Sequence, residues 1–194
     1  MIVNLKICGV GGQGVITTGI IASEAGISRG LNVVMSEIHG LAQRGGAVSV
    51  DIRFGDALGS MIPENRCDIL VALEPVEALR NVSRIKEGGL ALIGAERIPP
   101  ISLGISGKEY PDVESVLKEN YPGMRYLMVN SDEIAKQAGN PRTSNTVILG
   151  AAIATGVLPV DLQDVMRALD SRFTGEMLES NKKALGLGAK LVTV

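Results

Sequence analysis

The first residues in this chain whose types and spacing could do chemistry are 9–14, which read Gly-Val-Gly-Gly-Gln-Gly. Gly9, Gly11 and Gly14 match the G-x-G-x-x-G spacing of dinucleotide-binding loops. Glycine lets the backbone turn tightly, and the N–H groups at the start of a following helix attract an anion such as phosphate. The spacing alone fits a plain strand-to-helix turn equally well, so its meaning depends on residues further along the chain.

A second concentration of polar side chains lies at 36–46, which reads Ser-Glu-Ile-His-Gly-Leu-Ala-Gln-Arg-Gly-Gly. Glu37 lies about twenty residues after the glycine loop, where a dinucleotide fold places the acid that binds ribose. His39 is the only histidine of the chain, and three roles are open to it: a hydrogen-bonded structural residue, an interface or substrate-site residue, or a general acid–base group. Arg44 could bind a carboxylate or phosphate through two hydrogen bonds, or pair with Glu37 to order the loop.

Alternating strands and helices must position these two segments. Apolar runs bounded by turn residues predict strands at Val3–Cys8, Leu31–Met35, Ala47–Phe54, Ile69–Leu73, Leu90–Gly94 and Arg125–Val129. Helical spacing of apolar residues predicts helices at Val15–Arg29, Pro75–Val82, Asp112–Tyr121, Ser131–Ala138, Ser144–Thr155, Asp161–Ser171 and Gly175–Ala189. The segment 36–46 then leaves the carboxyl end of a strand beside the glycine loop, at the edge where open α/β sheets bind ligands. The side chains that could converge there are Gln13, Glu37, His39, Gln43 and Arg44.

This order of elements predicts an α/β fold, a three-layer α/β/α sandwich with a Rossmann-like βαβ start and a helical C-terminal part. The sheet is expected to be mostly parallel. Ala47–Phe54 alternates apolar residues with Ser49, Asp51 and Arg53, so it has one polar face and is expected to pair antiparallel, which makes the sheet mixed. With 194 residues, we expect one domain over 1–194.

Three local features are predicted with less support from periodicity. Asn130 and Glu133 have the spacing of a capping box for the helix at Ser131–Ala138. Asn145 is interpreted as a cap of the helix that it opens. Ile101–Ile105 fits either an edge strand or a loop after the break at Pro99-Pro100.

Composition excludes several classes of protein. The net charge is −2 and no block of Lys or Arg occurs, which argues against nucleic-acid binding. The first residues lack the basic stretch and cleavage site of a signal peptide, and the longest apolar stretch, near Val147–Leu158, is too short to span a bilayer. We therefore expect a cytoplasmic protein that contacts no membrane.

The two cysteines limit the cofactors that this chain can hold alone. An iron–sulfur cluster normally takes four thiolates, as does a Cys₄ zinc site, and only Cys8 and Cys67 are present. Both lie in or next to apolar strands, so we expect them to pack as small hydrophobic side chains. No metal site is predicted.

Taken together, the two polar segments resemble a known family. The pairing of Gly-Val-Gly-Gly-Gln-Gly-Val with Ser-Glu-Ile-His-Gly-Leu-Ala-Gln-Arg-Gly-Gly, followed by a strand ending Arg53-Phe54-Gly55, is similar to the gamma-type subunit of 2-oxoacid:ferredoxin oxidoreductases. The His-Gly and Gln-Arg-Gly-Gly forms are most similar to the beta subunit of indolepyruvate ferredoxin oxidoreductase. Asn145 with Leu149-Gly150-Ala151 resembles the C-terminal part of the same family, and the similarity covers essentially the whole chain.

The resemblance implies an enzyme that depends on a partner. The family oxidises a 2-oxoacid with coenzyme A to acyl-CoA and carbon dioxide, using thiamine diphosphate and passing electrons through [4Fe-4S] clusters to ferredoxin. This chain lacks cluster cysteines, and Gly55-Asp56-Ala57 departs from the Gly-Asp-Gly of a thiamine diphosphate signature. The resemblance therefore places those cofactors on a larger subunit and gives this chain a wall of the active site or a part in admitting coenzyme A. The candidate ligand or interface residues are Gly9, Gly11, Gly12, Gln13, Gly14, Ser36, Glu37, His39, Gly40, Gln43, Arg44, Gly45, Gly46 and Asn145.

Other functions remain open at this point. The chain could be the gamma subunit for another 2-oxoacid, such as pyruvate, 2-oxoglutarate or 2-oxoisovalerate. The glycine fingerprint and Glu37 also fit a stand-alone nicotinamide- or flavin-binding oxidoreductase, although no second catalytic domain is evident. A non-enzymatic nucleotide-sensing module is the third alternative.

Overall fold

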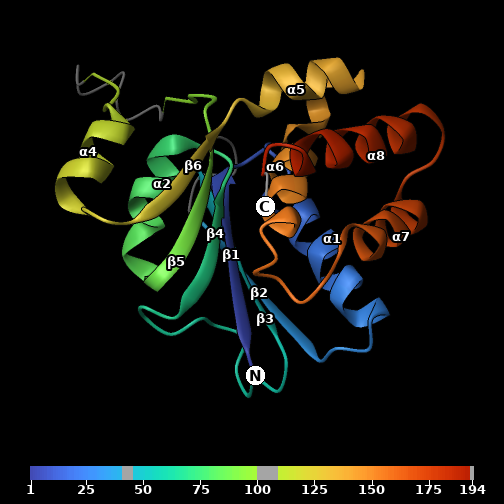
Figure 1. The fold of residues 1–194 in the computed structure, drawn as a ribbon, viewed down its shortest axis with the longest axis horizontal. Helices are drawn as coiled ribbons and strands as arrows, with labels where there is room; N and C mark the ends of the chain where they lie inside the picture. Colours follow the sequence, from blue (N-terminus) through green and yellow to red (C-terminus); the bar gives the residue numbers. More distant parts are fainter. Residues whose placement is uncertain (41–45, 100–108, 193–194) are drawn as a thin grey trace.

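A six-stranded sheet forms the centre of the computed structural model, which describes residues 1–40, 46–99 and 109–192. Its strands lie in the order β2-β3-β1-β4-β5-β6 (Figure 1). β1, β4, β5 and β6 are parallel to one another, whereas β3 pairs antiparallel with both β1 and β2. The predicted mixed, mostly parallel sheet is therefore confirmed. The strands are β1 (Val3–Val10), β2 (Val33–His39), β3 (Ala47–Phe54), β4 (Cys67–Ala72), β5 (Ile85–Gly94) and β6 (Arg125–Val129).

Helices cover both faces of this sheet, as the three-layer prediction requires (Figure 1). One face carries α2 (Pro75–Asn81), the short 3₁₀ helix η1 (Val82–Arg84) and α4 (Val113–Asn120). The other carries α1 (Val15–Ser28) and the C-terminal helices, which are α5 (Ser131–Ala138), η2 (Pro141–Thr143), α6 (Ser144–Ala154), α7 (Leu162–Arg172) and α8 (Gly175–Ala189). None of the helices in the described part of the chain combines the length and the apolar character needed to cross a bilayer.

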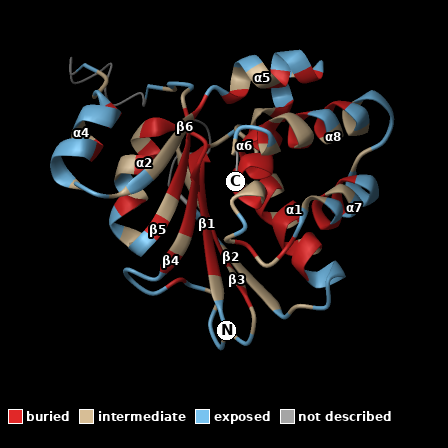
Figure 2. Ribbon diagram, viewed as in Figure 1, coloured by how far each residue is buried: buried red, intermediate tan, exposed pale blue. Residues whose placement is uncertain are grey.

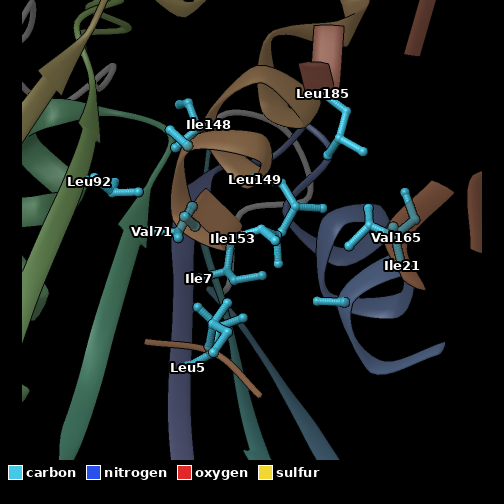
Figure 3. Close-up of a cluster of buried hydrophobic side chains, with 14 of the residues drawn as sticks. Leu5, Ile7, Ile21, Val71, Leu92, Ile148, Leu149, Ile153, Val165 and Leu185 are labelled. Atoms are coloured by element: carbon cyan, nitrogen blue, oxygen red, sulfur yellow. The ribbon is translucent and has the colours of Figure 1, made fainter. Parts of the chain in front are cut away.

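Two apolar clusters, one on each face of the sheet, hold these layers together. The larger cluster joins Leu5 and Ile7 of β1 to α1 and to the C-terminal helices (Figure 3). The smaller one joins Cys8 of β1 and Leu70 of β4 to α2 and α4. Figure 2 shows α6 buried along most of its length, as expected for a helix that is apolar on every side.

The main difference from the sequence-based expectation is the second strand. We expected it at Leu31–Met35 and a polar loop from residue 36, but β2 runs from Val33 to His39. Its last residues pair with β3, Glu37 opposite Val50 and His39 opposite Val48. Pairing along a well-formed antiparallel neighbour has extended the strand through polar residues that lack a strong preference of their own.

Three further expectations concern the start of β5, the capping of α5 and the segment Ile101–Ile105. β5 begins at Ile85 rather than at the predicted Leu90, so Gly88 and Gly89 lie inside the strand. The capping box at the start of α5 is wrong, because the side chain of Asn130 makes no capping hydrogen bond there. The expected segment Ile101–Ile105 lies outside the described residues.

The polar face of β3 is covered by another part of the chain. Asp51 is 1% exposed and pairs with Lys6 of β1, with 2.6 Å between Nζ and Oδ1. The segment between β3 and β4 covers this face: the N–H of Ile62 donates to Asp51 Oδ2 at 2.9 Å, and Arg53 donates to the carbonyl of Gly59 at 2.8 Å. The segment between β3 and β4 therefore buries part of the polar face of β3.

Candidate functional site

The glycine loop joins the carboxyl end of β1 to α1, at the edge of the sheet where α/β proteins bind ligands. Gly14 is the N-cap residue of α1 and has a left-handed backbone, with φ 82°. No side chain of the described residues caps this end of the helix, and its first turn holds no acidic residue. The N–H groups of the first turn of α1 therefore remain available to an anion.

The side chain of Gln13 stabilises this loop through two hydrogen bonds to backbone groups. Its Oε1 accepts a hydrogen bond from the N–H of Val10 at 2.8 Å, and its Nε2 donates to the carbonyl of Leu73 at 2.8 Å. Leu73 directly follows β4, so one side chain ties the glycine loop to the end of the neighbouring parallel strand. The structure places the amide of Gln13 against backbone rather than toward open space.

Asn145 does not cap α6, as we had interpreted it, because the N-cap of that helix is Thr143. Asn145 is 8% exposed, and its Nδ2 donates to Thr18 Oγ1 at 2.9 Å and to the carbonyl of Gly14 at 3.5 Å. Thr18 itself donates to the same carbonyl through its N–H and its hydroxyl, at 2.9 and 2.8 Å. Asn145 therefore fastens the glycine loop and α1 to α6.

The second polar segment, 36–46, is hydrogen-bonded to the glycine loop through Gly46, whose carbonyl accepts from the N–H of Gly11 at 2.9 Å. Near the other end of the segment, the N–H of Gly40 donates to the carbonyl of Ala47, the first residue of β3, at 2.8 Å. Gln43, Arg44 and Gly45 lie outside the described residues.

The residues of β2 do not all converge on the glycine loop. Glu37 is exposed and lies opposite Val50, which packs against Gly19 of α1, so Glu37 is on the α1 face of the sheet. Ser36 lies on the opposite face, where its hydroxyl donates to the carbonyl of Ser60 at 3.4 Å. His39 is the last residue of β2. Ser36 and Glu37 therefore lie on opposite faces of the sheet.

Two hollows flank the glycine loop. One of about 390 Å³ lies over the start of α1 and is lined by Gly11, Gly12, Gly14, Thr17 and Val48, among others. The second, of about 470 Å³, lies on the other side of Gly11–Gln13 and is lined by the ends of β5, α5 and η2. Its charged lining residues are Glu96, Asp132, Lys136 and Arg142.

Those four charged residues were missed by the sequence analysis. Glu96 and Asp132 directly follow the carboxyl ends of predicted strands, which is the signal that could have found them, whereas Lys136 and Arg142 lie further along the chain and have no such signal. Arg142 lines the 470 Å³ hollow and also a third hollow, of about 180 Å³, beside Asn145. An arginine and uncapped helix N–H groups both favour an anion at this edge of the sheet, whereas the carboxyl groups of Glu96 and Asp132 disfavour one.

Glu96 and Asp132 are two carboxyl groups that share one rim of the 470 Å³ hollow. Partial burial raises the pKa of Glu96, and the hydrogen bond and repulsion from Asp132 raise it further, while Lys136 opposes the shift. The protonated Glu96 can donate to Asp132, whereas two ionised carboxylates repel each other. The contribution of Glu96 to stability is therefore present below its ordinary pKa of 4.5 and is lost as the pH rises through the raised value.

We therefore expect the Glu96→Gln variant to gain stability relative to the wild-type protein as the pH rises from below 4.5 toward neutrality. The amide of glutamine donates to Asp132 at every pH, so the variant lacks this pH dependence. Melting temperatures measured across that pH range test the effect, with Glu87→Gln, at an exposed position on β5, as the control. Parallel curves for the wild type and Glu96→Gln would contradict the assignment.

The two cysteines do not fit an iron–sulfur cluster. Cys8 and Cys67 are fully buried in the sheet, and burial raises the pKa of both thiols, that of Cys67 to about 12. Such thiols stay protonated, whereas cluster ligands are thiolates. Among the residues that the structure describes, no three His, Cys, Asp or Glu side chains come together as a metal site.

The comparisons with known proteins agree on one family. The family model described as pyruvate ferredoxin/flavodoxin oxidoreductase matches residues 4–191. A curated relative, the indolepyruvate oxidoreductase subunit IorB of Methanothermobacter thermautotrophicus, is 39% identical over 191 residues, covering 96% of each chain. The chain therefore belongs to this family, and it is one subunit of a 2-oxoacid:ferredoxin oxidoreductase complex.

Two solved structures share the fold. The gamma subunit of a keto/oxoacid ferredoxin oxidoreductase from Geobacter sulfurreducens is 28% identical, with a TM-score of 0.70 and coverage of 97% of this chain and 96% of that one. The 2-oxoglutarate:ferredoxin oxidoreductase of Magnetococcus marinus, solved with 2-oxoglutarate, coenzyme A and succinyl-CoA bound, has a TM-score of 0.74 at 21% identity. The match covers 99% of this chain but 32% of that one, so the same fold also occurs as part of a longer polypeptide.

Proposed function

We propose that this chain is the small subunit of an indolepyruvate-type 2-oxoacid:ferredoxin oxidoreductase. The complex would oxidise an aryl pyruvate with coenzyme A to acyl-CoA and carbon dioxide and would reduce ferredoxin. The observation that carries the proposal is the 39% identity to an indolepyruvate oxidoreductase subunit over 96% of both chains. Identity spread over the whole length favours a shared role more strongly than a match confined to the glycine loop.

Thiamine diphosphate and the [4Fe-4S] clusters would be held by a larger partner subunit. The two buried, protonated cysteines of this chain support that division, because they do not fit a cluster with four thiolate ligands. When bound on the partner, thiamine diphosphate supplies the carbanion chemistry of decarboxylation. This chain would contribute surfaces that bind and orient.

The glycine loop would receive a phosphate group of coenzyme A. The uncapped N–H groups of α1, the left-handed Gly14 and the nearby guanidinium of Arg142 support this role, because all three favour an anion at the same edge of the sheet. Coenzyme A is bound in the Magnetococcus marinus enzyme, which has the same fold. Segment 36–46, with His39, Gln43 and Arg44, would face the partner's active site.

Reconstitution with the larger subunit tests this function. We expect the isolated chain to oxidise no 2-oxoacid, and the co-expressed pair to reduce a viologen dye with coenzyme A and an aryl pyruvate. A panel of indolepyruvate, phenylpyruvate, pyruvate, 2-oxoglutarate and 2-oxoisovalerate measures the specificity. Preference for a small 2-oxoacid would replace the indolepyruvate assignment with a gamma subunit of another enzyme in the same family.

Titration with NAD separates the proposal from a stand-alone dehydrogenase. The glycine spacing alone favours a dinucleotide site, so the isolated chain is the right material for this measurement. We expect no binding of NAD at micromolar concentration. Tight binding of NAD, together with an active self-sufficient oligomer, would overturn the proposed subunit role.

A further inference from the structure

The sheet has an open edge at β2. β2 is the outermost strand of the order, and in the described residues no further strand pairs with it. Gly40 donates to the carbonyl of Ala47, and Gly55 donates to the carbonyl of Asn32, so the even-numbered positions of β2 bond to β3. The N–H and C=O groups of Val33 and Met35 therefore point away from the sheet.

Three large apolar side chains are exposed on β2 and on the segment that covers one face of β3. Ile38 on β2 is 43% exposed, and Leu58 and Met61, in the segment that follows β3, are 107% and 56% exposed. Ile38 shares its face of β2 with Ser36, whose hydroxyl bonds to Ser60, so Met61 lies on the same side as Ile38. We call Ile38, Leu58 and Met61 the β2-edge patch.

The segment that carries Leu58 and Met61 is fastened in place. Arg53 donates to the carbonyls of Gly59 and Met61 at 2.8 and 3.4 Å, and the N–H of Ile62 donates to Asp51. The exposed side chains therefore project from a backbone that is held to β3. An apolar group presented on a fixed backbone loses little entropy when a partner covers it.

We propose that the β2 edge and the β2-edge patch dock the larger subunit of the oxidoreductase. This inference rests on the proposed function. Soluble proteins commonly protect an open edge with charged side chains, proline or a bulge, and β2 has no lysine, proline or bulge and one acidic residue, Glu37, which favours cover by another chain. In the Magnetococcus marinus enzyme this fold makes up 32% of the chain, so a much larger body is covalently joined to it there.

The position of the edge explains why the larger subunit is the occupant rather than a second copy. β2 runs toward Gly40, and Gly46 on the return bonds to Gly11 of the glycine loop. A chain lying along β2 therefore ends beside the proposed coenzyme A site. A partner that holds thiamine diphosphate must reach that site, whereas a second copy of this chain brings no reacting group to it.

Two charge substitutions in the patch test the proposal. We expect Ile38→Glu and Leu58→Glu each to weaken binding to the purified larger subunit by roughly tenfold or more, because a carboxylate would be buried against an apolar surface. Binding is measured by calorimetry and by reconstituted dye reduction. Ile27→Glu is the matched control, since Ile27 is 59% exposed on α1, which covers the opposite face of the sheet from the patch. Melting temperatures check that every variant is folded.

Each outcome decides one point. Weaker binding in both patch variants with an unchanged Ile27→Glu supports the docking surface, and Leu58→Glu alone suffices if Ile38→Glu fails to fold. Wild-type binding in the folded patch variants overturns it while leaving the proposed function intact. A dimer of the isolated chain that Ile38→Glu or Leu58→Glu abolishes would assign the patch to a second copy and also overturn it. Failure of the wild-type chain to bind or activate the larger subunit overturns the proposed function instead.

Discussion

Replacing Asp51 by alanine is expected to lower the free energy of unfolding by about 3–5 kcal/mol, because the change leaves a buried ammonium group without its partner. Lys6 and Asp51 are 2% and 1% exposed and lie opposite each other in the pairing of β1 with β3. Lys6 Nζ lies 2.6 Å from Asp51 Oδ1. The other carboxylate oxygen accepts the hydrogen bond from Ile62, so the variant loses two interactions of one side chain. Urea unfolding at neutral pH measures the loss.

An exposed ion pair provides the control for this prediction. Glu24→Ala breaks the pair with Arg172, in which both side chains are about one-third exposed, and should change stability by about 1 kcal/mol or less. The double variant Lys6→Met with Asp51→Leu removes both buried charges and should recover most of the loss, short of the unsatisfied N–H of Ile62. An Asp51→Ala variant no less stable than Glu24→Ala would contradict the assignment.

The buried pair of Lys6 and Asp51 also lies next to the segment that carries part of the β2-edge patch. Asp51 holds Ile62, and Ile62 follows Met61 of the β2-edge patch. Asp51→Asn retains an acceptor for Ile62 but not the charge that balances Lys6. We therefore expect Asp51→Asn to lower the stability of the fold while the hydrogen bond from Ile62 keeps the β2-edge patch in place.

Local patterns were enough to predict most of the elements. β3 at Ala47–Phe54, β6 at Arg125–Val129 and α8 at Gly175–Ala189 have the bounds that periodicity indicated, because each has a clear apolar face and is bounded by turn residues. β2 was predicted too short because pairing with β3, a tertiary interaction, decides where it ends. The order of the strands in the sheet was not predicted from the sequence, and in that order β3 lies between β1 and β2.

The candidate site was predicted less completely than the fold. The glycine loop was correctly predicted to join the first strand to the first helix, since glycine spacing is a local signal. The role of Asn145 was not, because its partners Gly14 and Thr18 lie more than a hundred residues earlier in the chain. Arg142 was missed for a related reason: only the folded sheet brings the start of α6 beside the end of β1. Contacts of this kind depend on topology, which residue spacing does not encode.

The Gly14→Ala variant is expected to impair both the stability of the protein and the glycine loop. An alanine at φ 82° costs about 1–2 kcal/mol in backbone conformation. Its Cβ would also lie 2.7 Å from Asn145 Nδ2, whose amide is held by Thr18, and overpacking at a fixed neighbour costs about 1–3 kcal/mol more. Unfolding free energy and the KM for coenzyme A in the reconstituted enzyme measure the two effects.

Gly30 separates the two causes of this loss. It has almost the same backbone, φ 81°, at the other end of α1, and a Cβ there would meet nothing within 4 Å. Gly30→Ala should therefore show the conformational cost alone and leave the KM unchanged. Adding Asn145→Ala to Gly14→Ala should relieve the clash and recover stability, a coupling that a double-mutant cycle detects. Equal losses in Gly14→Ala and Gly30→Ala would mean that Asn145 yields to the new methyl group, and that it does not hold the loop rigidly against α6.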